Sequence, residues 1–215
     1  MEQNFVINIG RQLGGGGMAV GKRLARRLGV PLYDKELIDL AARESGLCAT
    51  LFERADEREA KGLFATLVGY LRAPFAGYEG GNSNNVLSHE ALFKIQSDVI
   101  RDLAARQSCI FVGRCADYIL RDHPRALSLF LTADEEDRVE RLCRAHGWTA
   151  DEALSRIRRT DACRADYYNY YSARTWGEAA TYDLCLNTSR LGVERSVDFV
   201  LSFAAARLNL NIPTL

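Results

Sequence analysis

The chain has 215 residues, enough for one domain with its own hydrophobic core. Its 28 lysines and arginines balance its 28 aspartates and glutamates, whereas a protein that coats nucleic acid is normally basic, so we expect no nucleic-acid partner. No apolar run reaches the roughly 18 residues of a membrane span, and the N-terminal residues do not read as a secretory signal. The six cysteines form no CxxC pair, which favours reduced thiols and a cytoplasmic location.

Short apolar runs alternate with amphipathic stretches along the whole chain. The runs with the length and composition of buried strands are 5–10, 30–33, 109–113, 127–132 and 182–187. Helices are predicted after the first glycines, at 34–45, at 51–60, around 92–103, after Thr132, after Thr149 and at 193–208. This alternation predicts a five-stranded parallel sheet with helices on both faces, a three-layer α/β/α fold.

Local signals mark where some of these elements begin or end. Thr132 with Glu135 and Thr149 with Glu152 have the spacing of capping boxes that open helices. Residues 74–85 are rich in glycine and asparagine and predict a loop. Ligands of parallel α/β folds bind beyond the carboxyl ends of the strands. The residues expected at such ends are Gly10 with Arg11, Tyr33 with Asp34, and Gly113 with Arg114.

A glycine-rich stretch follows the first strand and offers two candidate phosphate loops. The letters GxxxxGK occur at 16–22, but they begin six residues after the strand, and Val20 already belongs to the apolar face of the next helix. We therefore predict that Gly21 and Lys22 lie inside the helix and that the loop is 10–17, "GRQLGGGG". Such a loop turns backbone N–H groups and a helix N-terminus toward an anion. The alternative is a flexible turn without a ligand.

The chain resembles the cytidylate kinase-like family in three blocks that occur in the expected order: "INIGRQLGGGGMAVGKRLARRLGVPLYDKELIDLAARESGL", "FVGRCADYIL" and "DYYNYYSARTWGEAATYDLCLNTSRLG". This family is a branch of the nucleoside monophosphate kinases, which have the P-loop NTPase fold. The resemblance covers essentially the whole chain and implies a single domain, 1–215. Within it, 46–95 would be an acceptor-binding helical segment and about 150–178 a lid.

The resemblance also implies a role for each part of the site. The phosphates of ATP would be held by the glycine loop, with added positive charge from its arginine (Arg11, Gly14, Gly15, Gly16 and Gly17). Asp34 and Arg114 would bind the acceptor, and lid arginines would stabilise the transferring phosphoryl group (Arg158, Arg159 and Arg164). Mg²⁺ is expected with ATP, and no residue of the chain is assigned as its ligand.

The chain departs from true cytidylate kinases at several of these positions. Gly17 stands where the loop lysine would be, and Ala19 stands where a hydroxyl would bind magnesium. Val112 and Cys115 flank the Gly-Arg pair in place of acidic residues. Asp117 lies close in sequence, but we expect it to point elsewhere if a helix begins at 115. The missing lysine leaves Arg11, Lys22 or another basic side chain as its possible replacement.

Each candidate side chain also has a structural interpretation. Arg114 would then be a surface residue, the lid arginines a solvated helix face, and Asp34 a helix cap. The tyrosines at 167, 168, 170 and 171 would pack the lid helix onto the sheet rather than stack on a base. The sequence thus predicts an ATP-dependent nucleoside monophosphate kinase with CMP or dCMP as acceptor. The alternatives are a non-catalytic nucleotide-binding module and a kinase of another small acceptor, and the oligomeric state is left open.

Overall fold

The computed structural model describes residues 4–34 and 89–210. The strands are β1 (Val6–Arg11), β2 (Leu32–Tyr33), β3 (Cys109–Val112), β4 (Ala126–Thr132) and β5 (Leu184–Asn187). The helices are α1 (Gly17–Leu28), α5 (His89–Arg106), α6 (Ala116–Ile119), α7 (Glu135–His146), α8 (Ala150–Ser172) and α9 (Thr188–Leu208), with a 3-10 turn at Ala179–Thr181. Apart from Asp34, the predicted helices at 34–45 and 51–60 and the loop at 74–85 lie outside the described residues.

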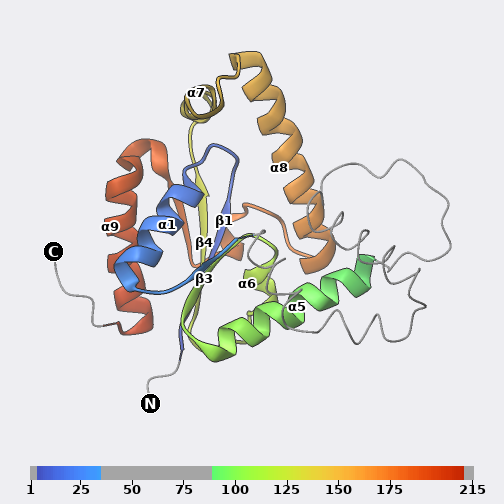
Figure 1. The fold of residues 1–215 in the computed structure, drawn as a ribbon, viewed down its shortest axis with the longest axis vertical. Helices are drawn as coiled ribbons and strands as arrows, with labels where there is room; N and C mark the ends of the chain where they lie inside the picture. The colour runs from blue at the N-terminus through green and yellow to red at the C-terminus, as the bar shows by residue number, and fades with distance from the viewer. Residues whose placement is uncertain (1–3, 35–88, 211–215) are drawn as a thin grey trace.

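The five described strands form one parallel sheet in the order β2-β3-β1-β4-β5. Helices α1 and α9 cover one face of this sheet, and α5 and α6 lie on the other, with α8 rising beside it (Figure 1). The predicted three-layer α/β/α architecture is therefore confirmed. Because the strands are parallel, their carboxyl ends meet at one edge, where the glycine loop also begins.

Strand β1 is central because its side chains enter two separate cores. Ile7 and Ile9 are at most 1% exposed and pack in the cluster that includes α1 and α9. Val6 belongs to the other cluster, which includes residues of α5, α6 and α8. Burial on both faces explains why the strand reads as a continuous apolar run rather than an alternating one. It also fixes the carboxyl end of β1, and with it the position of Arg11.

The two predicted capping boxes have different outcomes. Thr149 accepts a hydrogen bond from the Glu152 amide at 3.3 Å and Glu152 accepts one from the Thr149 amide at 2.9 Å, so this capping box at the start of α8 is confirmed. The box at Thr132 is wrong, because α7 begins only at Glu135 and has Asp134 as its N-cap. The Thr132 hydroxyl bonds the Gln12 side chain instead.

The last helix begins earlier than predicted. Its first turns, from Thr188, precede a kink at Gly192, whose φ of 70° breaks the helical backbone. The predicted helix at 193–208 corresponds to the part after this kink. Asn187, the last residue of β5, caps the start of α9 by accepting a hydrogen bond from the Ser189 amide at 2.8 Å. The strand therefore passes directly into the helix.

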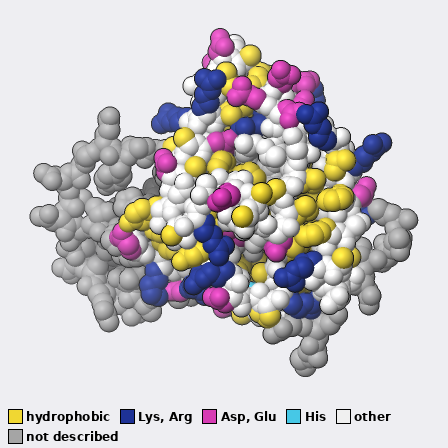
Figure 2. All heavy atoms as spheres, turned by 180° about the vertical axis from the view of Figure 1, so that it is seen from behind, with side chains coloured by type: hydrophobic (Ala, Val, Ile, Leu, Met, Phe, Trp, Pro, Cys, Tyr) yellow, Lys and Arg dark blue, Asp and Glu magenta, His cyan; other side chains and the backbone are white. Residues whose placement is uncertain are grey.

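Two global features agree with the composition. On the face drawn in Figure 2, acidic and basic side chains are interspersed rather than gathered into a single basic surface. Within 4–34 and 89–210, no helix combines the length and the apolar character needed to cross a membrane.

Candidate phosphate- and acceptor-binding site

The glycine loop leads from β1 straight into α1. Gly14 and Gly16 have φ of 74° and 76°, a left-handed conformation that glycine adopts without strain, and Gly16 is the N-cap of α1. Gly21 is buried inside this helix, where a Cβ would lie 3.0 Å from Leu32 Cδ1, and Lys22 is exposed. The prediction that the letters at 16–22 are not the loop is therefore confirmed.

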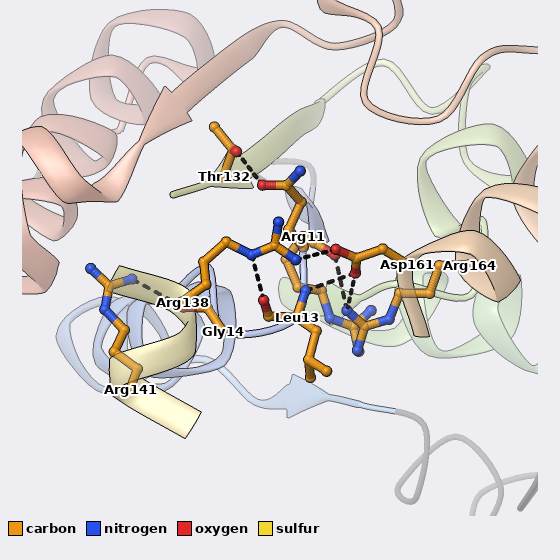
Figure 3. Close-up of polar contacts among 9 residues, drawn as sticks. Arg11, Leu13, Gly14, Thr132, Arg138, Arg141, Asp161 and Arg164 are labelled. Atoms are coloured by element: carbon orange, nitrogen blue, oxygen red, sulfur yellow. Dashed lines mark hydrogen bonds and ion pairs between the residues drawn. The ribbon is translucent and has the colours of Figure 1, made fainter. Parts of the chain in front are cut away.

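Side chains that follow more than a hundred residues later in the chain hold three consecutive carbonyl groups of this loop. Arg138 Nε donates to the Leu13 carbonyl at 2.7 Å, and Arg141 Nη1 donates to the Gly14 carbonyl at 3.1 Å. The Thr188 hydroxyl donates to the Gly15 carbonyl at 3.1 Å. The loop conformation is thus fixed by α7 and by the first residue of α9, as Figure 3 shows for the two arginines.

Fixing the carbonyls also directs the amides. In a planar trans peptide the C=O of one residue and the N–H of the next point in opposite directions. The amides of Gly14 and Gly16 therefore point away from Arg138 and Thr188. The first-turn amides of α1 have no acceptor within the helix, and they add the positive end of its dipole. This backbone offers an anion site that needs no side chain at Gly17.

One loop amide is already bound to a carboxylate of the lid helix. Asp161 Oδ1 on α8 accepts the Leu13 N–H at 2.8 Å. The same carboxylate forms an ion pair with Arg138 and lies 3.4 Å from Arg164 Nη1. Arg138, Arg164 and the loop surround Asp161 in Figure 3. An acidic side chain therefore lies where the loop and two arginines together favour negative charge.

A strained turn follows β3 and presents Arg114. Gly113, Arg114 and Cys115 have φ of 80°, 62° and 55°, so three consecutive residues are left-handed. Each non-glycine residue in this conformation costs about 1–2 kcal/mol. Gln96 Nε2 on α5 donates to the Arg114 carbonyl at 3.0 Å and supports the turn. Strain of this kind is retained where it orients a functional side chain, and here it directs Arg114, which is 8% exposed.

A cavity of about 260 Å³ lies between these carboxyl ends and α8. Its described lining includes three arginines from three elements: Arg11 from β1, Arg114 from the turn after β3, and Arg164 from α8. Asp117, Tyr168 and Tyr182 also line it. The cavity therefore combines a cationic end next to the glycine loop with an aromatic wall.

The charges of this cavity influence one another. Removal from water, and then the charges of Arg164 and Arg114, lower the pKa of Arg11, while Asp34 and Asp161 oppose this shift. Burial also lowers the pKa of Arg164, against the opposing effect of Asp161. Burial is the main cause of both lowered pKa values, and the charges of neighbouring arginines add to it. An anionic ligand would stabilise the charged form of both side chains.

Asp117 corrects one expectation from the sequence. It lines the cavity instead of pointing elsewhere, because Cys115 acts as the left-handed N-cap and α6 begins only at Ala116. Its Oδ2 accepts a hydrogen bond from the Tyr168 hydroxyl at 2.6 Å. Burial raises the pKa of Asp117, and the bond from Tyr168 partly offsets this. The cavity thus contains a carboxylate that the sequence did not predict there.

The structure brings some of the predicted site residues together and leaves others apart. Arg11, Arg114 and Arg164 share the cavity, and the charge of Asp34 reaches Arg11. Arg158 and Arg159 are exposed on α8, and neither lines this cavity. Their role in transfer stays a prediction. The predicted acceptor-binding segment, 46–95, lies outside the described residues up to position 88.

Tyrosines of the lid helix divide between packing and the cavity. Tyr168 is 5% exposed and Tyr170 is 69% exposed, so only part of the cluster packs against the body of the protein. Tyr171 stacks on Phe93 of α5, with ring centroids 4.0 Å apart. The predicted packing onto the sheet is confirmed for Tyr168, which shares a cluster with Phe111 and Phe130, whereas Tyr171 packs on α5. Tyr167 and Tyr168 also line the cavity.

Several residues of the site had not been predicted. Arg138, Arg141 and Thr188 hold the loop, and Asp161 binds its Leu13 amide. A weak signal existed for Asp161, which is an acidic residue in an otherwise basic stretch of the lid, "RIRRTDACR". The other three carry no local signal, since their partners lie more than a hundred residues earlier in the chain, as for Arg138 and Leu13, 125 residues apart.

Comparison with known proteins agrees with this geometry. The cytidylate kinase-like family matches residues 6–190. The chain belongs to this family. Among curated proteins, a cytidylate kinase of Methanothrix thermoacetophila (strain DSM 6194 / JCM 14653 / NBRC 101360 / PT) is 31% identical over 93 residues, which are 43% of this chain and 52% of that protein. The match thus spans about half the length of this curated relative.

Solved structures extend the likeness to the whole fold of this family member. An uncharacterized protein from Eubacterium ventriosum ATCC 27560 is similar with a TM-score of 0.72 and 26% identity, over 95% of this chain and 100% of that one. Shikimate kinase from Bacteroides thetaiotaomicron is similar with a TM-score of 0.52 and 15% identity, over 96% and 99% of the two chains. The predicted P-loop kinase fold is confirmed.

Proposed function

We propose that this cytidylate kinase-like protein transfers the γ-phosphoryl group of ATP to a nucleoside monophosphate, with CMP or dCMP as the expected acceptor. The main support is the cavity beside the glycine loop. It brings Arg11, Arg114 and Arg164 from three elements to one cationic end. Phosphoryl transfer needs little covalent chemistry from the protein, but it does need the reactants positioned and the charge of the moving group balanced.

The arrangement suggests a separate role for each part. The amides of the loop and the start of α1 would bind the donor phosphates. Arg114, which comes from the strained turn, would bind the acceptor phosphate, with Asp34 at the neighbouring strand end. Arg164 belongs to the lid helix and would stabilise the charge of the transferring group when the lid is closed. The acceptor phosphate can attack as an ionised oxygen, so no general base is assigned.

The aromatic part of the cavity fits a nucleobase of a particular kind. Tyr168 and Tyr182 line it beside the carboxylate of Asp117. A carboxylate accepts hydrogen bonds, and cytosine presents an exocyclic amine that donates one. Uracil has an acceptor oxygen at the same position, which would face the carboxylate unfavourably. Asp117 therefore supports cytosine as the expected base.

Magnesium would enter with ATP. Among the described residues, no group of three or more histidine, cysteine, aspartate or glutamate side chains could hold a metal ion. Mg²⁺ is commonly held by substrate phosphates, water and one or two carboxylates. The described residues therefore fit an ion that is bound mainly through the phosphates of ATP. The proposal assigns no magnesium ligand within the chain.

The cytoplasmic location of the protein stays a prediction.

The test is an assay of the purified protein with ATP, Mg²⁺ and a panel of nucleoside monophosphates, in which ADP and the acceptor diphosphate are both quantified. ADP and the acceptor diphosphate, CDP from CMP or dCDP from dCMP, should form in equal amounts, and only when CMP or dCMP is present. ADP formation that requires a different small acceptor would identify a kinase of another specificity. Transfer to none of the acceptors would contradict the proposal.

A non-catalytic nucleotide-binding module is the second candidate. It is supported by Gly17 and Ala19, which replace the lysine and the hydroxyl of an ordinary loop. This candidate predicts that ATP raises the thermal stability of the protein without being turned over. The same samples can be followed by thermal unfolding, so both candidates are tested together.

A further inference from the structure

The residue types at the two ends of the glycine loop are exchanged relative to an ordinary phosphate loop. An ordinary loop starts with glycine and has lysine six residues later, where its helix begins. Here α1 begins at Gly17 after the N-cap Gly16, so Gly17 takes the lysine position. Six residues before Gly17, in place of the first glycine, is Arg11.

The structure shows why Gly17 and Arg11 occur together. A Cβ added to Gly17 would lie 2.5 Å from Arg11 Cβ and 2.9 Å from Arg11 Cγ. Side-chain atoms do not approach this closely, so no residue larger than glycine fits at 17 while Arg11 keeps its place. The stem of Arg11 thus fills the space in which a side chain at 17 would begin.

The far end of Arg11 meets a second glycine. A Cβ on Gly113, at the end of β3, would overlap Arg11 Nη1. Gly113 also has a φ of 80°, which disfavours any other residue. Gly17 and Gly113 therefore form the two walls of a slot that holds Arg11. This slot leads from the start of α1 to the cationic end of the cavity.

The surroundings of Arg11 suit a group that binds phosphate. Arg11 lines the cavity together with Arg114 and Arg164, and the Arg164 guanidinium donates to the Arg11 carbonyl at 3.2 Å. Lys22, the lysine of the literal GxxxxGK letters, is exposed on α1. Of the two basic residues that the sequence offers as replacements, only Arg11 lies at both the loop and the cavity.

We propose that Arg11 takes over the function of the missing loop lysine and contacts the transferring phosphoryl group of ATP, in a slot that Gly17 and Gly113 keep open. The proposal rests on the kinase function proposed above. In the transfer, an acceptor phosphate oxygen forms a bond to the γ-phosphorus, and the bond from that phosphorus to the β–γ bridging oxygen breaks. ADP leaves with the electron pair. Arg11 exchanges no proton and balances the negative charge, and its planar fork can hold two phosphate oxygens at once.

The experiment places glycine at position 11 and lysine at position 17, the residue types of an ordinary phosphate loop, first singly and then together. It compares the wild type with Arg11→Gly, Gly17→Lys and the double variant Arg11→Gly/Gly17→Lys, which has the glycine and the lysine of an ordinary loop, in the CMP assay. Arg11→Gly should lower kcat about 10²-fold, as expected for the loss of one group that stabilises transition-state charge. Gly17→Lys alone should be inactive or poorly folded, because its side chain overlaps Arg11. The double variant should be at least about 10-fold more active than Arg11→Gly.

Lys22→Ala is the matched control, since it removes the other candidate lysine, and it should keep wild-type activity. Thermal unfolding of each variant establishes that it is folded before its activity is compared. Wild-type kcat in Arg11→Gly would overturn the proposal, and so would a folded double variant no more active than Arg11→Gly.

A second measurement separates this inference from the proposed function. The affinity for ATP and for inorganic triphosphate is determined by calorimetry for the wild type and for Arg11→Gly. At least about 10-fold weaker binding by the variant supports the role of Arg11 even if the wild type phosphorylates no monophosphate. Equal affinity, in a wild type without transfer activity, would overturn the role of Arg11 independently.

Discussion

The two halves of the site are built in different ways. The glycine loop presents backbone amides, and residues of α7 and α9 fix it by holding its carbonyls. The cavity presents long side chains, with Arg114 on a left-handed turn and Asp117 at the start of α6. A backbone site survives the loss of a side chain better than a side-chain site does. A loop without a side chain at position 17 can therefore still offer its amides to an anion, whereas the cavity depends on its three arginines.

The largest effect on the cavity half of the site is expected from replacing Arg114. We expect Arg114→Gly to lower kcat/KM for CMP by about 10²- to 10³-fold, because a buried arginine that pairs with phosphate contributes about 2–5 kcal/mol. ATP binding should change little, since the loop amides are untouched. The measurement is steady-state kinetics with CMP varied, together with calorimetry for ATP.

The same variant offers an independent check on the strained turn. Glycine adopts the φ of 62° found at Arg114 without strain, so Arg114→Gly should relieve about 1 kcal/mol of backbone strain, and thermal unfolding establishes that the variant is folded. Arg121→Gly, which changes an exposed arginine outside the cavity, is the control and should leave kcat/KM unaffected. Unchanged use of CMP by the Arg114 variant would remove this residue from the acceptor site.

The loop half of the site is tested by removing Arg138, one of the side chains that hold the loop carbonyls. Arg138 is 6% exposed, pairs with Asp161 and holds the Leu13 carbonyl. Breaking a buried pair from one side costs about 3–5 kcal/mol, and we expect Arg138→Leu to lose about 3 kcal/mol because Asp161 keeps Arg164 nearby. ATP affinity should fall as well, since the loop amides lose their fixed direction. Chemical denaturation and calorimetry measure the two effects.

The control for this variant lies on the same helix. Arg144 is exposed on α7 and pairs with Glu140 one turn away. Exposed pairs of this kind contribute about 0.3–0.5 kcal/mol, so Arg144→Leu should be nearly neutral in both measurements. If Arg138→Leu were equally neutral, the loop would not depend on its anchors, and the contrast between the two halves would be lost.

The smallest expected effect is the pH dependence that Asp117 contributes. Burial raises the pKa of Asp117, so the folded protein binds this proton more tightly than the unfolded chain does. The resulting stability is present at low pH and is lost as the pH rises from the ordinary aspartate range through the raised pKa. Asp117→Asn should lack this loss and should therefore gain on the wild type, on the order of 1 kcal/mol, as the pH rises.

Thermal unfolding of both proteins between acidic and neutral pH measures the difference. Parallel profiles would contradict the assigned pKa direction.

Asp117→Asn also tests the proposed base specificity, because asparagine can donate to the acceptor oxygen of uracil where aspartate cannot. The ratio of kcat/KM for CMP over UMP should fall in Asp117→Asn, and an unchanged ratio would separate this carboxylate from base recognition.

Features with a local cause could be predicted from the sequence. The strand, loop and helix at the start of the chain and the capping box at Thr149 each depend on residues within one short window. The predicted box at Thr132 was wrong because α7 starts after Asp134, while Thr132 is still held in the sheet opposite Asn187. Local spacing cannot show such pairing. Asp117 was misplaced for a related reason, since its direction depends on the left-handed Cys115 just before it.

Contacts between distant parts of the chain could not be predicted. The Leu13 amide and Asp161 are 148 residues apart, and the Thr188 hydroxyl reaches the Gly15 carbonyl across 173 residues. These bonds exist only because α7, α8 and α9 return to the carboxyl edge of the sheet. The sequence indicated which backbone would form the loop, but not which side chains would hold it.

The bond between Asp161 and the Leu13 amide has a kinetic consequence. A phosphate oxygen can use this amide only after the carboxylate has left it, so opening of the contact precedes binding there. The rate of ATP binding measured by stopped flow would then level off at high ATP concentration, at the rate at which this contact breaks. The affinity would be reduced by the fraction of molecules in which Asp161 occupies the amide. The lid helix would thus compete with the nucleotide for the Leu13 amide.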